Sequence, residues 1–328
     1  MRYYFAPMEG ITGHIYRNAH RRVFGGVDRY FTPFITPNQS RSLTTRELRD
    51  MLPDHNPAPD VVPQVMTSNP EHFCWAASKL AQLGYSEVNL NLGCPSRTVV
   101  SKGRGAGLLA HLDALAALLD GIFSGTTLAV SVKTRIGLDS KAALAELIEL
   151  FNRYPIRELT VHPRLQIDYY KGMPDQDAFE YALRNSIAPV AYNGNLFTTA
   201  DMMNVCSRFT GVSALMLGRG AVADPSLPRR AQGGPPATRA ELAELHGKVL
   251  DGYMAELRDP LTALFRMKEL WSYMGAMFSG AQPYLKRIRK ATRLPAYSDA
   301  VHALLEECEF APVDELDARL VGCAPNAT

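Results

Sequence analysis

The sequence of 328 residues predicts a parallel eight-stranded (β/α)8 barrel followed by a small all-helical C-terminal domain. Three observations predict this fold. Eight short apolar runs recur between residues 2 and 220, amphipathic segments alternate with them, and only helical patterns follow residue 240. The alternative is an open, doubly wound sheet. The lack of a Gly-x-Gly-x-x-Gly motif after the first apolar run disfavours that alternative.

The eight predicted strands are apolar on both faces, as expected of strands that are covered on both sides. They span residues 2–8, 29–35, 61–66, 87–93, 128–136, 158–164, 189–195 and 214–220. Between them, amphipathic patterns predict helices at 69–83, 111–124, 141–153 and 198–208. Ser-Asn-Pro-Glu and Thr-Thr-Ala-Asp, at the first and last of these helices, are typical of helix N-termini. This alternation is the pattern of a TIM barrel.

A change of composition at residues 229–242 separates the barrel from the region that follows it. Gly-Gly-Pro-Pro at 233–236 is typical of a linker. After it, helical patterns cover 238–257, 260–277, 281–292 and 298–308. The sequence therefore predicts a barrel domain over 1–232, a linker over 233–240, a helical domain over 241–312 and a tail over 313–328.

Charge and cysteine content exclude some classes of protein. The net charge is +2, so any surface for nucleic acid is confined to part of the molecule, and residues 258–293, with eight basic and two acidic side chains, are the candidate. Five cysteines without a Cys-x-x-Cys pair argue against disulfides and against a metal site. The sequence shows no signal peptide and no apolar run of 18 residues, so we expect a cytoplasmic, monomeric protein without a membrane segment.

Polar residues follow the predicted strands at the end where barrel enzymes carry their chemistry. In strand order they are Pro7, Met8 and Glu9; Gln64; Asn91 and Cys94; Lys133 and Arg135; His162 and Arg164; Asn193, Gly194 and Asn195; and Gly218, Arg219 and Gly220. Because the carboxyl ends of barrel strands meet at one rim, we expect these residues to converge there.

Cys94 and Lys133 have the most direct chemistry. A thiol with a pKa near its ordinary value of about 8.5 stays protonated at neutral pH and donates a proton, whereas a thiolate nucleophile needs a nearby cation or base. Lys102 and Arg104 follow Cys94 in a glycine-rich loop, so spacing alone leaves both roles open. Lys133 lies in an apolar strand, where it either forms a Schiff base, faces an electron-rich ring or points outward to solvent.

The other rim residues suit ligand binding, and each has a structural alternative. Gly218 and Arg219, with Asn193, match the phosphate site that barrels form after their last two strands, and a plain glycine turn is the alternative. Gln64 suits the edge of a planar heterocycle, as does Asn91. His162 is a proton carrier, a hydrogen-bond donor to a ligand, or a structural histidine.

These motifs, taken in order, resemble the tRNA-dihydrouridine synthase family. The matching segments are APMEG at 6–10, PQVM at 63–66, NLNLGCPSRTVVSKGRGAGLL at 89–109, VSVKTRIG at 130–137, the His-x-Arg of His162 and Arg164, NGN at 193–195 and LGRGA at 217–221. The resemblance spans the barrel and extends into the helical region through RMKELWSYM at 266–274. Seven motifs in the same order are far more specific than any one of them.

The resemblance implies a flavoprotein oxidoreductase that uses FMN, reduced by NADPH, to reduce the C5=C6 bond of a uridine in tRNA to 5,6-dihydrouridine. It implies hydride transfer to C6, protonation of C5 by Cys94, and Lys133 beside the pyrimidine edge of the flavin. It assigns Asn91 and Arg135 to the uracil. The other residues that it assigns to FMN are Pro7, Met8, Glu9, Gln64, His162, Asn193, Gly194, Asn195, Gly218 and Arg219.

A role in RNA binding follows from the same resemblance. A stacked uridine must leave the folded RNA, and cations that contact phosphates position the strand. The candidate cations are Lys102 and Arg104 in a lid after Cys94, and Arg266, Lys268, Lys286, Arg287 and Lys290 in the helical domain. For the last group a solvated helix face is the alternative. HPRLQIDYYKG at 162–172 and FTPF at 31–34 depart from the family pattern.

Several alternatives stay open at this point. The motifs leave undecided which uridine is reduced, whether the RNA is tRNA or another structured RNA, and whether NADPH or NADH is the reductant. A flavin-dependent reductase of a free pyrimidine, a lyase that forms a Schiff base at Lys133, and a non-catalytic RNA-binding protein are the competing functions.

Overall fold

A parallel β-barrel forms the centre of the first part of the chain. The structure is a computed structural model that describes residues 1–57, 59–257 and 259–311; the predicted tail over 313–328 lies outside the described residues. The barrel strands are β1 (Arg2–Phe5), β2 (Arg29–Phe31), β3 (Val61–Val62), β4 (Gln64–Val65), β5 (Glu87–Leu92), β6 (Ala129–Arg135), β7 (Leu159–His162), β8 (Val190–Asn193) and β9 (Ala214–Leu217).

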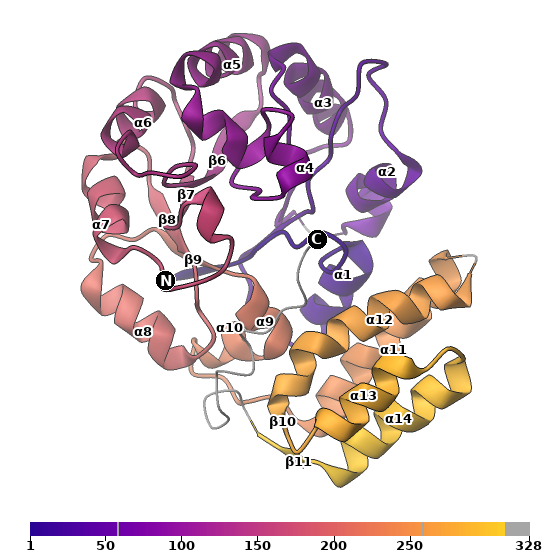
Figure 1. The fold of residues 1–328 in the computed structure, drawn as a ribbon. Helices are drawn as coiled ribbons and strands as arrows, with labels where there is room; N and C mark the ends of the chain where they lie inside the picture. Colours follow the sequence, from indigo (N-terminus) through magenta and orange to yellow (C-terminus); the bar gives the residue numbers. More distant parts are fainter. Residues whose placement is uncertain (58, 258, 312–328) are drawn as a thin grey trace. The chain divides into compact units, whose positions relative to one another are not determined.

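The sheet closes because β3 and β4 are two parts of one extended segment. The strand order is β3-β2-β1-β9-β8-β7-β6-β5-β4, so β3 and β4 lie at the two ends of the order, and only Pro63 separates them in the chain. The Pro63 carbonyl accepts a hydrogen bond from the Asn89 backbone N–H at 2.8 Å. Counting β3 and β4 as one gives eight strand positions, which confirms the predicted (β/α)8 barrel (Figure 1).

Helices alternate with the strands. They are α1 (His14–Val23), α2 (Thr45–Met51), α3 (Pro70–Gln82), α4 (Arg97–Val100), α5 (Leu112–Gly125), α6 (Leu144–Phe151), α7 (Gln176–Asn185), α8 (Thr199–Arg208), α9 (Arg219–Ala223) and α10 (Leu227–Arg230). Short 3-10 turns add η1 (Pro53–His55), η2 (Gly105–Ala110) and η3 (Gln166–Asp168). The four predicted helices are confirmed as α3, α5, α6 and α8. Helix α1 was not predicted from the sequence, because it buries His14, Arg17 and His20 and its pattern is therefore not purely apolar.

The C-terminal region consists mainly of four helices, as predicted. These are α11 (Arg239–Glu256), α12 (Pro260–Met274), α13 (Gln282–Lys290) and α14 (Leu294–Glu307), with η4 (Gly275–Met277) after α12. The expectation that no strand follows the barrel was wrong. β10 (Phe278–Ser279) pairs antiparallel with β11 (Glu309–Phe310), and the rings of Phe278 and Phe310 lie 5.1 Å apart. Two-residue strands are too short to show an alternating pattern in the sequence.

Two compact units divide the chain at different points from the predicted domains. One unit holds residues 1–7, 28–195 and 205–216, and therefore nearly all of the barrel strands. Of the described residues, the other holds 8–27, 196–204, 217–257 and 259–311, so it combines α1, α9 and α10 with the C-terminal helices. These units reflect contacts between residues, and the predicted boundary at residue 232 between a barrel domain and a helical domain stays a prediction.

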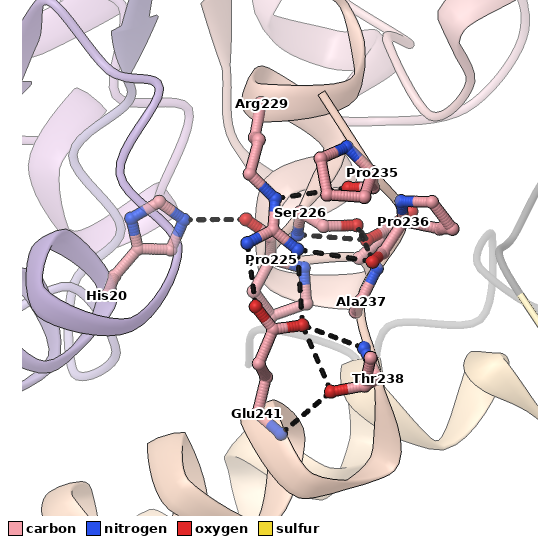
Figure 2. Close-up of polar contacts among 10 residues, drawn as sticks. His20, Pro225, Ser226, Arg229, Pro235, Pro236, Ala237, Thr238 and Glu241 are labelled. Atoms are coloured by element: carbon pink, nitrogen blue, oxygen red, sulfur yellow. Dashed lines mark hydrogen bonds and ion pairs between the residues drawn. The ribbon is translucent and has the colours of Figure 1, made fainter. Parts of the chain in front are cut away.

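The segment predicted as a linker, 233–240, is ordered within that second unit. Arg229 donates hydrogen bonds to the carbonyls of Pro235 and Pro236 at 3.0 and 3.2 Å and forms an ion pair with Glu241 at 2.7 Å (Figure 2). The Ser226 hydroxyl accepts from the Ala237 N–H at 3.0 Å. One arginine therefore fixes both the proline turn and the first turn of α11.

A buried histidine joins α1 to this network. His20 Nε2 lies 2.8 Å from the Pro225 carbonyl, and because a carbonyl only accepts, this nitrogen carries the proton (Figure 2). Burial lowers the pKa of His20 to about 4, so the ring is neutral at physiological pH. His20 is therefore a structural residue of the second unit.

The interior of the barrel has an apolar half and a polar half. Tyr192 on β8 faces outward, since its ring lies 4.7 Å from Phe179 of α7, so its neighbour Ala191 faces inward. The apolar half is the buried cluster of Tyr4, Ala6, Phe31, Val62, Ala191, Ala214 and Met216. The register pairs Gln64 with Asn89, Asn89 with Ser131 and Asn91 with Lys133, and these five residues are the polar half.

Candidate active site

The polar half of the barrel is a continuous chain of hydrogen bonds. Asn89 Nδ2 donates to Ser131 Oγ at 3.0 Å, and Gln64 Nε2 donates to Asn89 Oδ1 at 2.8 Å. Asn91 Nδ2 donates to Gln64 Oε1 at 2.7 Å. The chain joins β6, β5 and β4, and each amide orients the next. The sequence analysis missed Asn89 and Ser131, whose signal was a polar residue at every second position of an otherwise apolar strand.

This chain of hydrogen bonds ends at the turn that carries Cys94. Asn91 Oδ1 accepts hydrogen bonds from the backbone N–H groups of Gly93 and Cys94 at 3.0 and 2.9 Å. Asn91 is buried, whereas Cys94 is half-buried and its thiol is not in a disulfide. The amide chain therefore fixes the backbone at Cys94, a residue that keeps part of its surface exposed.

Lys133 is the cation of this site. It lies beside Asn91 in the register of β5 and β6 and is half-buried. Burial, reinforced by the nearby Arg135, lowers the pKa of Lys133 to about 7, and the thiol of Cys94 acts in the opposite direction. Among the described residues, no carboxylate forms an ion pair with Lys133. A half-buried ammonium without an anionic partner is suited to an anionic ligand.

Arg135 anchors loops at the barrel mouth. Its guanidinium donates to the carbonyls of Gly93, Leu165 and Tyr169 at 2.9, 2.8 and 2.7 Å, and it lies 5.6 Å from the centre of the Tyr170 ring. These contacts occupy three of the five N–H groups of the guanidinium. Direct contact between Arg135 and substrate stays a prediction, and its visible role is to join the Cys94 turn to the segment after β7.

His162 and Arg164 form a second cluster at the mouth. Arg164 Nη1 lies 2.9 Å from His162 Nε2, and because arginine only donates, Nε2 accepts and the ring proton lies on Nδ1. Arg164 also donates to the Lys171 and Gly172 carbonyls and, at 3.0 Å, to Asn195 Oδ1. His162 Nε2 is thus already engaged, and Arg164, which was expected at the rim without an assigned role, orders two loop segments, at residues 171–172 and at Asn195.

The turn after β8 lies beside this cluster. Asn193 Nδ2 donates to the Met216 carbonyl at 2.7 Å. A side chain at Gly194 would lie 3.3 Å from the His162 ring, and Asn195 adopts a positive φ of 43°. The sequence Asn-Gly-Asn therefore suits a tight turn that brings its backbone close to His162.

The segment after Cys94 is folded rather than an open loop. α4 follows Ser96, and η2 begins at Gly105, which has a φ of 54°. A side chain at Gly105 would lie 3.0 Å from the Cys94 carbonyl. Lys102 is exposed and Arg104 half-exposed, and neither side chain forms an ion pair or hydrogen bond within the described structure. A lid movement of this segment stays a prediction.

The remaining predicted ligand residues are divided between the two units. Pro7 belongs to the first unit, and Met8, Glu9, Gly218 and Arg219 belong to the second. Within the second unit, Arg219 begins α9 and lies 5.2 Å from the centre of the Phe197 ring. A side chain at Gly220 would lie 1.9 Å from the Leu196 carbonyl, so only glycine fits there.

The five predicted RNA contacts of the helical region differ in availability. Arg266 donates to the Gly10 carbonyl at 3.4 Å and lies 3.9 Å from Glu269, and Lys268 donates to the Ala291 carbonyl. Lys286, Arg287 and Lys290 are exposed on α13 without a side-chain partner in the described part of the chain. The three α13 cations are therefore available to a polyanion, and the other two are engaged.

The candidate site in the first unit combines cations with neutral amides. Its cations are Lys133, Arg135 and Arg164, and its neutral amides are Gln64 and Asn91. An electron-rich ring with an anionic edge matches this set. Within residues 1–57, 59–257 and 259–311, no group of three His, Cys, Asp or Glu side chains is placed to hold a metal. In the same residues, no helix combines the length and apolar character needed to span a bilayer.

Sequence comparison matches the chain to one enzyme family. The profile of the dihydrouridine synthase family covers residues 4–318. The tRNA-dihydrouridine(16) synthase of Vibrio vulnificus (strain CMCP6) is 26% identical over 323 residues, which are 95% of this chain and 100% of that protein. The probable tRNA-dihydrouridine synthase 2 of Bacillus subtilis (strain 168) is 25% identical over 95% of both chains.

Structural comparison supports the barrel. Morphinone reductase superposes with a TM-score of 0.52 over 73% of this chain and 87% of that chain, at 12% identity. Histamine dehydrogenase from Rhizobium sp. 4-9 superposes with a TM-score of 0.55 over 85% of this chain and 51% of that chain, at 13% identity. At these identities the likeness shows the fold alone.

Proposed function

The chain belongs to the dihydrouridine synthase family, and from this premise we propose that it reduces uridine in tRNA to 5,6-dihydrouridine, with FMN as cofactor and NADPH as reductant. The observation that carries the proposal is the pairing of Lys133 with the Cys94 turn. A half-buried ammonium without a carboxylate partner in the described residues lies near the half-buried Cys94, whose backbone is fixed by Asn91. This arrangement provides an anion site and a proton donor at one barrel mouth.

FMN supplies hydride chemistry when it is bound, and this chain's residues supply the rest. We assign the ring to Gln64 and Lys133, with Pro7, Met8 and Glu9 as further contacts. The phosphate is assigned to Asn193, Gly194, Asn195, Gly218 and Arg219. His162 contributes to the same site through the turn that it packs against. The positive charge of Lys133 stabilises negative charge on a bound ring, since the site is partly removed from water.

Cys94 acts as a general acid in this proposal. The Sγ–H bond breaks, its proton goes to C5 of the uracil, and the thiolate that forms is stabilised by the nearby Lys133 and Arg135. Asn91 holds the Cys94 N–H, so it keeps the thiol in position. The thiol regains its proton from solvent before the next turnover.

The proposed function also requires contacts to the RNA outside the reacting uridine. A uridine in folded tRNA must leave its stack to reach a barrel mouth, and phosphate contacts position the strand. We assign these contacts to Lys102 and Arg104 in the first unit. In the second unit we assign them to Lys286, Arg287 and Lys290, which are exposed and unpaired within the described residues.

Mass spectrometry of tRNA tests the proposal. We expect tRNA from a strain without this protein to lack the mass of two added hydrogens at one or more uridines. The purified protein should be yellow with bound FMN and should restore that mass with NADPH. A colourless protein that does not bind FMN, or reduction of free uracil without reduction of tRNA, would contradict the proposal.

A further inference from the structure

A pocket lies beside the Cys94 turn, on the side of α4. It has a volume of about 440 Å³ and is lined by Arg97, Val100, Ser101, Gln166, Ile167 and Tyr169. Pockets of about 300–1,000 Å³ hold small ligands. All six residues belong to the first unit, and none of them has a role in the reaction proposed above.

Both walls of this pocket are tied to the turn that carries Cys94. Arg97 is three residues after Cys94 in the chain, and the opposite wall is η3 with the residues after it. Gln166 Nε2 donates to the Pro95 carbonyl at 2.8 Å. Arg135 holds the carbonyls of Gly93 and Tyr169 at once. The pocket therefore keeps a fixed position relative to the turn that carries the reactive thiol.

The backbone at Tyr169 is strained. This residue has a φ of 51° and a ψ of −97°, outside the regions that a bulky side chain prefers. The hydrogen bond from Arg135 to its carbonyl stabilises that conformation. Strain that is maintained by neighbouring contacts is often found at ligand sites, and here the strained residue is one of those that line the pocket.

The lining combines one cation with an apolar surface. Arg97 is exposed, and within the described part of the chain its guanidinium has no hydrogen bond or ion pair with another side chain. Ile167 is 55% exposed and Val100 lies across from it. An aromatic ring, aliphatic groups and an unpaired guanidinium together suit a base with its phosphate, because bases stack on rings and arginines bind phosphate.

We propose that this pocket binds a nucleotide that flanks the target uridine in the RNA, with its base against Tyr169 and Ile167 and its phosphate at Arg97. The proposal rests on the proposed function. RNA is the source favoured over a dinucleotide, because two cations follow α4 in the chain, the exposed Lys102 and the half-exposed Arg104, and provide further phosphate contacts for a strand. The pocket thereby holds in place the nucleotide next to the reduced uridine.

Fluorescence of an RNA pentanucleotide tests this site without turnover. The probe has a central uridine and 2-aminopurine on its 5′ or 3′ side, and stacking on protein changes the emission of that base. We expect the full-length protein to change the emission at one of the two positions. Tyr169→Leu should abolish the change, and Arg97→Gln should weaken binding several-fold and reduce its salt dependence.

Matched variants on α7 serve as controls. Tyr181→Leu removes an exposed ring and Arg184→Gln an exposed cation from that helix, and neither should alter the emission. Arg97 is exposed, so its replacement tests the proposal even if Tyr169→Leu fails to fold. Because the readout needs no flavin, a protein that does not reduce uridine but passes this test would contradict only the proposed function.

Three results would overturn the site. One is the same emission change in Tyr169→Leu, Arg97→Gln and the α7 variants. Another is a higher KM for NADPH in Arg97→Gln with an unchanged RNA signal, which would assign the pocket to the dinucleotide. The third is concentration-dependent self-association that Ile167→Asp abolishes, which would assign the surface to a second copy of the chain.

Discussion

The two halves of the barrel interior are held together by different interactions, apolar packing in one and hydrogen bonds in the other. The apolar half is a packed cluster around Tyr4, Phe31 and Met216, in which the side chains contribute volume. The polar half is a chain of amides and a hydroxyl in which every link depends on the next. Both halves are buried, but only the polar half leads to a reactive group. The comparison of the two halves indicates that the hydrogen-bonded amides are the part of the core that determines where Cys94 lies.

The largest difference in stability should come from matched replacements in the two halves. Gln64→Met keeps the side-chain volume but leaves Asn89 Oδ1 and Asn91 Nδ2 buried without partners, which costs about 1–3 kcal/mol for each group. Met216→Leu conserves volume in the apolar half and should cost less than about 1.5 kcal/mol. Urea unfolding measures both. Equal losses of unfolding free energy in the two variants would show that the hydrogen bonds of the amide chain contribute no more to stability than the apolar packing does.

Lys133→Met should separate activity from stability. Removal of a cation that stabilises developing charge should lower turnover by about 10²–10³-fold. The same change should raise the unfolding free energy near neutral pH, because it removes a desolvated ammonium. A variant that loses both activity and stability would show that Lys133 is a structural residue. Thermal unfolding together with NADPH-dependent turnover distinguishes the two cases.

The pH dependence of stability at Lys133 has a definite sign. The pKa of Lys133 is lowered from 10.5 to about 7 in the folded protein, so between these values the unfolded chain binds the additional proton. The unfolding free energy of the wild type should therefore rise relative to Lys133→Met from about pH 7 to pH 10.5. The advantage of the methionine variant is largest below pH 7. An advantage that stays constant from pH 6 to pH 10 would contradict the lowered pKa.

The smallest change in stability and turnover should come from a replacement at the opposite end of the barrel. Glu87, at the start of β5, forms ion pairs with Arg29 at 2.8 Å and with Arg157 at 2.7 Å. Both arginines are partly exposed and can be hydrated, so Glu87→Gln should cost about 1 kcal/mol. Turnover should not change, because this end of a barrel contributes stability rather than chemistry. A tenfold loss of turnover at unchanged stability would contradict this division.

The barrel, and the order in which polar residues follow its strands, could be predicted from the sequence. Eight apolar runs with Cys94, Lys133 and Asn91 at their ends predicted the rim, because strand periodicity and chain order are local properties. The role of Arg135 could not be predicted, because its three carbonyl partners come from loops up to 42 residues away. The same holds for the link between Arg229 and residues 235–241, since a proline-rich segment in sequence alone is typical of a linker.

Replacement of Cys94 tests the central claim most directly. We expect Cys94→Ala to retain FMN and its reduction by NADPH, but to form dihydrouridine about 10²–10⁴-fold more slowly than the wild type. Cys74→Ala is the matched control, since that half-buried thiol lies on α3 and donates to the Gly121 carbonyl. It should retain both reactions. Dihydrouridine formation by Cys94→Ala at the wild-type rate would contradict the role of the thiol as the proton donor.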